Sequence, residues 1–459
     1  MHRLCLVASS LLAFAVAPNL GAQKVCSRSS AGLTPLTDLG AGTYLGQDGG
    51  LYGGGQNQPP AAHTAAGVAA GAAIQPLDAA GQPAAGGTIG VLSIGMSNTS
   101  QEFSTWVDFS DLDRERAAPV VVVDGAQSGM DAARWVSPTG RPWSVAGQRL
   151  AAAGVSAAQV QAVFVKQALA LPSSLLFPAH KDELATALVA IVQNVQAMYP
   201  NVRQCFFTSR IYGGYSPRAE RTEPLSYETG FSVRDVVLRQ IAGDPALNFD
   251  PSQGPVRAPW LAWGPYIWAD GLTPRADGLT WRCDDFAQDG IHPSRAGRLQ
   301  VSDMIDAYFR TSSFTPWYLG PARPAAAGIL VYGTPCLGAS GRATETPNGL
   351  PTLGNAGYAL AASRLPGGAA AAILIGTDRT RSPLARNCNL WVGLAGMVSI
   401  GHVTSGSGGA TQSLPIPNDP TLDGARVYTQ WLAPDAGGTV VPGIGGLGMT
   451  PGQLHQLGT

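Results

Sequence analysis

Between residues 88 and 209 the sequence contains a series of short apolar runs, separated by helical patterns. The runs TIGVLSIG, PVVVVDG, QAVFVKQ and VRQCFFTS are rich in β-branched or aromatic residues, and each ends in polar or glycine residues. Such runs are typical of parallel strands buried on both faces. Between the third and fourth runs, apolar residues recur at helical spacing until Pro200. Strands alternating with helices predict an α/β fold with a doubly wound parallel sheet.

The remaining segments predict a second, smaller domain. A last helix is expected over Ser294–Phe309, followed by a connector rich in Pro, Ala and Gly. Turn signals then recur about every ten residues between runs such as AAAAILIGT and ARVYTQWLA, the pattern of an all-β sandwich. The predicted organisation is a signal peptide (1–22), an irregular Gly/Ala/Pro-rich segment packed on the next domain (23–87), the α/β domain (88–318), a linker (319–327) and a β-sandwich (328–459).

The N-terminus predicts export. It combines Arg3, an apolar run from Leu4 to Val16, and the small residues Gly21 and Ala22, as a cleavable signal peptide does. No later segment reaches the roughly 18 apolar residues of a membrane span, so we expect a secreted protein, extracellular or periplasmic. The 29 basic and 30 acidic residues form no basic stripe, which argues against nucleic acid as a partner. Nothing in the sequence indicates an oligomeric state.

Export also predicts disulfides, because the destination is oxidising. Five cysteines follow the predicted signal peptide: Cys26, Cys205, Cys283, Cys336 and Cys388. Cys336 and Cys388 both lie in the C-terminal third and form one hypothesised bridge. Cys205 and Cys283 form the second, which leaves Cys26 free or able to exchange partners.

Polar and glycine residues follow the predicted strands at the edge where open α/β sheets bind ligands. Ser97 follows the first strand, Gly129 follows the second, and Lys166 with Gln167 ends the third. His292 precedes the last helix, and a carboxylate, Asp289, stands three residues before it. Such a carboxylate can fix the imidazole tautomer and stabilise its protonated form.

The combination predicts a catalytic triad of Ser97, His292 and Asp289. Two other readings stay open. Asp284 and Asp285 are rival carboxylates, although they stand seven or more residues from His292 and suit loop or capping roles better. A metal site built from Asp284, Asp285, Asp289 and His292 is the other, because carboxylates and imidazole are common metal ligands.

In four stretches the chain resembles the SGNH, or GDSL-like, hydrolase family: IGMSNT, QSGMD, VFVKQA and DGIHPS, within roughly Thr88–Phe314. The resemblance implies a flavodoxin-like three-layer fold. It also implies that Ser97 is the nucleophile, that His292 is the general base and then acid, and that Asp289 orients it. The backbone N–H groups of Ser97 and Gly129 would form an oxyanion hole.

Two positions depart from the family pattern. Met96 replaces the usual aspartate before the serine, and Lys166-Gln167-Ala168 replaces the usual Gly-x-Asn-Asp. The missing asparagine would supply a third oxyanion donor. The side-chain amide of Gln167 is the hypothesised substitute, with the Lys166 cation as the alternative. The opening QKVCSRSSAGLTPLTDLGAGTY and the later phrase YGTPCLG are similar to a group of secreted two-domain bacterial proteins, which implies no substrate.

The long segment between the fourth strand and Asp289 is rich in tryptophan, and aromatic faces suit sugar rings or acyl groups. Packing of the segment onto the sheet is the alternative. Arg210, Tyr212 and Arg218, near the end of the fourth strand, suit a polar or acidic substrate, unless they pair with loop carboxylates. The predicted substrate-binding residues are Lys166, Arg210, Tyr212, Trp263 and Trp268.

The function expected from these observations is that of a secreted serine esterase. It would hydrolyse an ester, such as an acetyl group on a carbohydrate or a small molecule, through an acyl-enzyme and without a cofactor. Two alternatives remain. The first is a catalytically silent sugar-binding or cell-surface protein on the same scaffold, and the second is a lipase-like or polyester-cleaving esterase.

Overall fold

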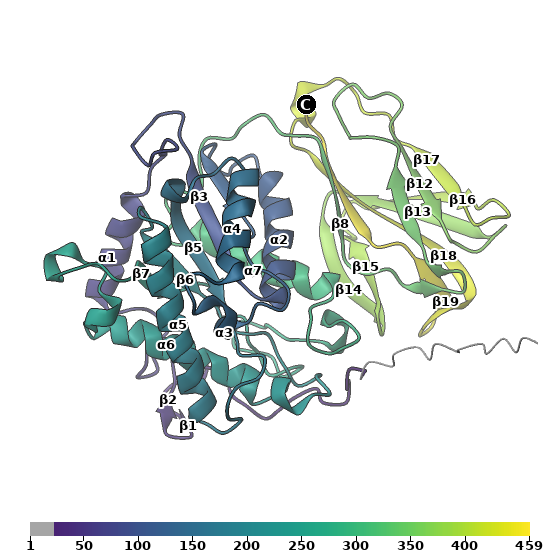
Figure 1. The fold of residues 1–459 in the computed structure, drawn as a ribbon. Helices are drawn as coiled ribbons and strands as arrows, with labels where there is room; N and C mark the ends of the chain where they lie inside the picture. Colours follow the sequence, from purple (N-terminus) through teal and green to yellow (C-terminus); the bar gives the residue numbers. More distant parts are fainter. Residues whose placement is uncertain (1–22) are drawn as a thin grey trace, which may run out of the picture.

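The computed structural model describes residues 23–459, so the predicted signal peptide lies outside the described residues. An α/β unit is followed by a β domain beside it (Figure 1). In the described part of the chain, no helix is both long and apolar enough to cross a bilayer.

The α/β unit is built on a five-stranded parallel sheet with the order β4-β3-β5-β6-β7. Its strands are β3 (Ile89–Gly95), β4 (Val120–Val123), β5 (Val160–Lys166), β6 (Gln204–Phe207) and β7 (Trp260–Trp263). The first four match the four predicted runs, with β5 beginning one residue earlier than its run, and their burial explains the near-continuous apolar sequence. Numbered along the chain, the order is 2-1-3-4-5, so the strand order reverses next to β3. The parallel α/β sheet is thereby confirmed, and β7 is an additional strand.

Helices cover both faces of this sheet. On one face, α2 (Ser97–Asp111) packs against α7 (Arg295–Thr311), with the rings of Trp106 and Phe309 stacked at 4.7 Å between centroids. On the other face, α5 (Ala179–Met198) packs against α6 (Leu225–Ile241) and α3 (Ala132–Trp135), and α4 (Arg141–Ala152) contacts α3 (Figure 1). The helices predicted before Pro200 and over Ser294–Phe309 are confirmed as α5 and α7, whereas α6 lies in a segment where no helix was predicted.

The segment 23–87 was predicted to be irregular, but parts of it form regular secondary structure. It contains α1 (Ala61–Ala72) and a small hairpin of β1 (Thr43–Tyr44) and β2 (Gln47–Asp48). Gly67 of α1 lies so close to the Trp260 ring that a Cβ atom there would stand 2.1 Å from it. The glycine and alanine residues that suggested irregular structure therefore allow a helix to pack closely against β7.

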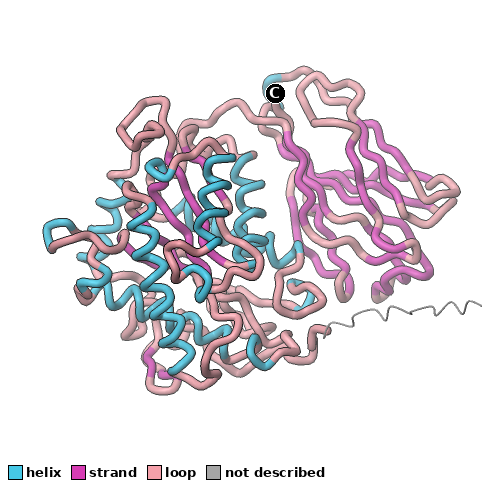
Figure 2. Tube along the Cα trace, in the orientation of Figure 1, coloured by secondary structure: helices cyan, strands magenta, loops and turns pink. Residues whose placement is uncertain are grey.

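The C-terminal domain consists almost entirely of strands and loops (Figure 2). The strands of its sheets pair antiparallel. One sheet has the order β16-β13-β18-β20-β8 with β19 added to β18, and another has the order β11-β12-β17. Leu360, Ile373 and Trp431 from the two sheets share one buried cluster, and a β14-β15 hairpin packs beside the larger sheet. Its strands are β8 (Gly328–Tyr332), β9 (Leu337–Gly338), β10 (Gly341–Arg342), β11 (Thr344–Pro347), β12 (Ala359–Ser363), β13 (Ala370–Gly376), β14 (Arg379–Ala385), β15 (Cys388–Val392), β16 (Val398–Val403), β17 (Ala410–Ser413), β18 (Arg426–Val441), β19 (Gly445–Met449) and β20 (Gly452–Gln456).

Two disulfides tie the chain within residues 23–459, and one of the two hypothesised pairings is wrong. Cys336 bonds to Cys388, as predicted. Cys283 bonds to Cys26 and not to Cys205. Cys205 lies within β6 and is fully buried as a free thiol, and burial raises its pKa. Cys205 is enclosed within the sheet, whereas Cys283 lies in the short 3-10 helix Cys283–Asp285, where the N-terminal segment brings Cys26 to it.

Candidate active site

Ser97 is the first residue of a helix that begins directly after the first strand of the sheet. β3 ends at Gly95, Met96 is the N-cap, and α2 begins at Ser97. A Cβ atom on Gly95 would lie 2.2 Å from the Thr99 hydroxyl, so the sharp turn from strand to helix requires glycine there. The first N–H groups of a helix have no intrahelical acceptor. The turn therefore presents both the Ser97 hydroxyl and its backbone N–H at the carboxyl edge of the sheet.

Ser97, His292 and Asp289 form one chain of hydrogen bonds. The Ser97 Oγ lies 2.8 Å from His292 Nε2, and His292 Nδ1 lies 2.5 Å from Asp289 Oδ2. The imidazole thus donates from Nδ1 to the carboxylate and accepts the serine proton at Nε2. The structure brings together the three side chains that were predicted to act together.

Asp289 is held by its own loop. Its Oδ1 accepts the backbone N–H groups of Ile291 and His292, both at 3.0 Å. Partial burial raises the pKa of Asp289, but the hydrogen bonds from the His292 ring and from these two backbone groups outweigh it, and the net pKa is lowered. Asp289 is therefore a carboxylate at neutral pH, with both oxygens engaged.

The backbone N–H groups of Ser97 and Gly129 are available as donors. Both residues line one cavity of about 450 Å³ together with His292. Neither N–H donates a hydrogen bond to any residue within 23–459. Gly129 has a φ of +75°, a conformation that favours glycine, and its Cα faces open space. Two unpaired N–H donors beside a serine hydroxyl suit the oxygen of a tetrahedral intermediate.

Lys166 and Gln167 do not reach the cavity. The Lys166 ammonium forms a buried ion pair with Glu102 of α2, and both side chains are 1% exposed. The Gln167 side chain is buried without a hydrogen-bond partner and is not part of the cavity lining. Both predictions of a third oxyanion donor are therefore wrong for the conformation observed, because these residues at the end of β5 point into the protein interior.

The aromatic residues predicted to bind substrate are also interior. Tyr212 donates to the Arg28 carbonyl, Trp263 to the Leu51 carbonyl and Trp268 to Glu223. None of the three rings lines the cavity, and each is at most 3% exposed. Trp260 and Trp281 are buried as well. The alternative reading, in which the tryptophan-rich segment packs down onto the sheet, is the one observed.

The cavity lining adds residues that sequence reasoning missed. Arg210 lines it as predicted, and Arg221, Asp131 and Asn98 join it. Asn98 donates from its side chain to the Ile291 carbonyl at 2.9 Å and so fastens α2 to the segment from Cys283 to His292, the histidine loop. Its position next to Ser97 was a usable signal. Arg221 lies in a charged loop between β6 and α6, where the sequence alone does not indicate proximity to Ser97.

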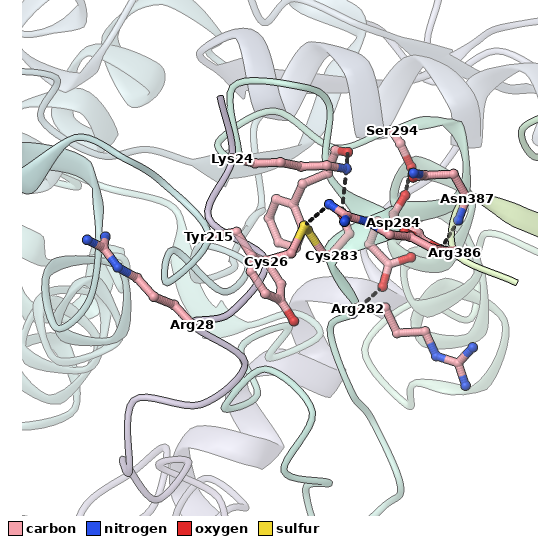
Figure 3. The surroundings of a disulfide bond; sticks show 12 residues. Lys24, Cys26, Arg28, Tyr215, Arg282, Cys283, Asp284, Ser294, Arg386 and Asn387 are labelled. Carbon is pink, nitrogen blue, oxygen red and sulfur yellow. Dashed lines mark hydrogen bonds between the residues drawn. A yellow bond between two sulfur atoms is a disulfide. The ribbon is translucent and has the colours of Figure 1, made fainter. Parts of the chain in front are cut away.

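The loop that carries Asp289 and His292 is tied to the N-terminal segment (Figure 3). Cys26 bonds to Cys283 at the start of the loop. The Lys24 ammonium donates to the carbonyls of Cys283 and Phe286, both at 2.7 Å. The Lys24 N–H donates to the Gln288 carbonyl at 2.7 Å. A segment more than 250 residues distant in sequence thereby fixes the backbone just before Asp289.

The β14-β15 hairpin of the C-terminal domain holds the same loop from another side. The Asn387 N–H donates to Asp284 at 2.6 Å, as Figure 3 shows, and Arg386 contacts the Cys26 sulfur. Arg381 forms an ion pair with Asp285, which is fully buried. Burial raises the pKa of Asp285, and the Arg381 guanidinium opposes this rise. Asp284 and Asp285 thus serve domain docking rather than contact with His292.

Arg381→Ala is expected to destabilise the protein by about 3 to 5 kcal/mol, because it leaves the buried Asp285 charge without its partner. Urea unfolding followed by tryptophan fluorescence measures this change. Arg379→Ala is the matched control on the same hairpin, since Arg379 pairs with Asp303 at 2.5 Å where both side chains are partly exposed. It should cost about 1 kcal/mol or less. Equal losses in the two variants would contradict the role assigned to Arg381.

Within residues 23–459, no group of three or more His, Cys, Asp or Glu side chains is arranged to hold a metal ion. The four residues weighed as a metal site have other partners. Asp284 accepts from Asn387, Asp285 pairs with Arg381, and Asp289 binds His292.

Comparisons with known proteins add little. The chain matches no family model and no curated protein. A protein from Arabidopsis thaliana is 13% identical, covers 46% of this chain and 67% of its own, and has a TM-score of 0.25. Catalytically inactive OgpA from Akkermansia muciniphila, in complex with an O-glycopeptide, is 10% identical over 76% of this chain and 89% of its own, with a TM-score of 0.15. A beta-glucosidase from Bifidobacterium adolescentis is 12% identical over 85% and 53%, with a TM-score of 0.14. These likenesses support no conclusion about function.

Proposed function

We propose that this protein is a secreted serine esterase of SGNH type that removes an acyl group, such as acetyl, from a carbohydrate. The observation that carries the proposal is the hydrogen-bonded chain from Ser97 through His292 to Asp289, at the edge of a cavity. The 2-1-3-4-5 strand order is compatible with the SGNH resemblance. The two disulfides are compatible with an exported protein.

The geometry suits a two-step acyl transfer. The Ser97 Oγ attacks the ester carbonyl carbon while His292 Nε2 takes its proton, and the N–H groups of Ser97 and Gly129 bind the oxyanion. Collapse expels the alcohol, which takes the proton from His292 and leaves an acyl-serine. Water then attacks the acyl carbon as His292 takes its proton. Release of the carboxylic acid returns the proton to Ser97.

Charged groups in the cavity favour a sugar ester over a long acyl chain. The lining combines Arg210, Arg221 and Asp131 with apolar surface from residues such as Leu169 and Ile291. A lipase-like site would present a broad apolar surface without such charges to an acyl chain. The carbohydrate proposal rests on these charged side chains and not on stacking by the buried tryptophans, and the apolar residues leave room for a short acyl group.

A fluorophosphonate probe tests the proposal directly, because it phosphonylates only an activated serine. We expect labelling at Ser97, located by mass spectrometry of peptides, together with hydrolysis of p-nitrophenyl acetate. Labelling should be lost when the protein is first unfolded in urea. An unlabelled Ser97 in folded protein, with no ester hydrolysis, would support the silent sugar-binding alternative.

A further inference from the structure

Two guanidinium groups line the cavity that holds Ser97 and His292. Arg210 follows β6 at the carboxyl edge of the sheet, and Arg221 is the last residue of a short 3-10 helix, Ala219–Arg221. Asp131 is the one carboxylate in this lining, and its Oδ2 accepts the Ala170 N–H at 2.8 Å. The cavity therefore has an excess of positive charge beside the serine hydroxyl.

Arg210 differs from the other buried arginines of the described chain. It is 7% exposed, yet its side chain makes no ion pair or hydrogen bond with any residue in 23–459. The side chain of Arg221 likewise has no ion pair or hydrogen bond within these residues. The other buried arginines each pair with an aspartate: Arg116 with Asp111 at 2.5 Å, Arg234 with Asp48 at 3.2 Å, and Arg275 with Asp277 at 2.6 Å.

The carboxylates nearest to Arg210 are already engaged. Glu102 pairs with Lys166. Glu223 accepts the Gly213 N–H at 2.6 Å, the Tyr227 N–H and the Trp268 indole. Both oppose the lowering of the Arg210 pKa by burial, but neither lies within ion-pairing distance. A guanidinium stays protonated, and burying it without a partner destabilises the fold. An anionic ligand at this position would recover that cost on binding.

We propose that Arg210, assisted by Arg221, binds an anionic group on the substrate while Ser97 attacks the ester. The inference rests on the proposed esterase function and names its substrate class, an acylated acidic sugar. A planar guanidinium fork matches the two oxygens of a carboxylate, and it also binds sulfate. The shared chemistry is an oxyanion attached to the sugar that carries the ester.

Three matched acetylated sugars test the proposal: acetylated methyl galactoside, the same sugar with a carboxylate at carbon 6, and the same sugar with a sulfate there. The measured quantity is kcat/KM for acetate release. We expect wild type to prefer at least one anionic sugar over the neutral one by about tenfold to a hundredfold, the range of a charge-assisted hydrogen bond. Comparing kcat/KM for the carboxylate sugar with that for the sulfate sugar identifies which anionic group the cavity prefers.

Arg210→Gln should reduce this preference to near unity, mainly through KM, and Arg210→Lys should restore part of it. Arg218→Gln is the matched control, since Arg218 is 56% exposed, pairs with Glu220 at 3.8 Å and does not line the cavity. It should keep the full preference. Equal rates for all three sugars in wild type, or a preference that survives Arg210→Gln combined with Arg221→Gln, would overturn the proposal.

Binding separates this inference from the proposed function. In the Ser97→Ala protein, calorimetry should detect binding of galacturonate or of galactose 6-sulfate. Galactose should bind at least about tenfold more weakly. Adding Arg210→Gln should remove the difference. If no ester is hydrolysed but this anion preference is seen, the esterase proposal fails and the anion site stands. If esters are hydrolysed but neither assay shows a preference for the anionic sugars, the anion site fails and the esterase proposal stands.

Discussion

Ser97→Ala is expected to lower kcat/KM for p-nitrophenyl acetate by about 10⁴-fold or more, as loss of the nucleophile does in serine hydrolases. The hydroxyl forms one side-chain hydrogen bond, to His292, so its removal should leave the fold intact. The expected signature is therefore a lost reaction with an unchanged circular dichroism spectrum and unfolding midpoint. Initial rates of wild type and variant, purified identically, measure it.

Ser100→Ala provides the matched control for this result. Ser100 lies one turn further along α2 and donates to Asp124 at 2.6 Å, outside the cavity lining. It should hydrolyse the ester within a few-fold of wild type. If Ser97→Ala keeps more than a tenth of the wild-type rate, Ser97 is not the nucleophile and the hydrogen bond to His292 has another role.

Local patterns in the sequence predicted the elements that position the site. A strand buried on both faces needs a continuous apolar run, and an amphipathic helix needs apolar residues at helical spacing. The sequence therefore predicts β3, β5 and α5. The Asp289–His292 pair could also be predicted from the sequence, because both residues lie in one turn and their spacing alone brings them together. β7 was not predicted, because its four residues lie in a long segment without a clear strand pattern.

The parts that failed depend on long-range packing. Cys26 meets Cys283 only because the N-terminal segment crosses the histidine loop, and nothing local to either cysteine encodes that path. Trp263 and Trp268 are equally compatible in sequence with a substrate platform and with a buried core, and burial decided between them. Lys166 looked like a free cation because its partner, Glu102, lies 64 residues away in sequence.

The histidine loop shows why a domain beyond the α/β sheet bears on the site. Its start is fixed by Cys26 and Lys24 from one side and by Arg381 and Asn387 from the other. Catalysis by a serine and a histidine requires their separation to be held within about half an ångström. The two docked segments therefore add contacts that fix the start of the loop from Cys283 to His292.

Asp289→Asn is expected to lower kcat by about 10⁴-fold while leaving the loop in place. The amide keeps one oxygen for the N–H groups of Ile291 and His292, but its nitrogen would donate toward His292 Nδ1. The imidazole would then carry its proton on Nε2 and could not accept the Ser97 proton. Steady-state kinetics of wild type and variant on p-nitrophenyl acetate measure the loss.

Asp284→Asn is the control that separates orientation from loop integrity, since Asp284 stands in the same segment and accepts from Asn387. It should retain kcat within a few-fold, and a loss equal to that of Asp289→Asn would contradict the assignment.

The pH dependence of stability gives a second readout for Asp289. The pKa of Asp289 lies below its value in the unfolded chain, about 3.9. The ionised carboxylate therefore stabilises the folded state above that pH, and this contribution is lost as the pH falls toward the lowered pKa. The stability difference between wild type and Asp289→Asn should accordingly narrow below about pH 4, because only the wild type has this carboxylate to protonate.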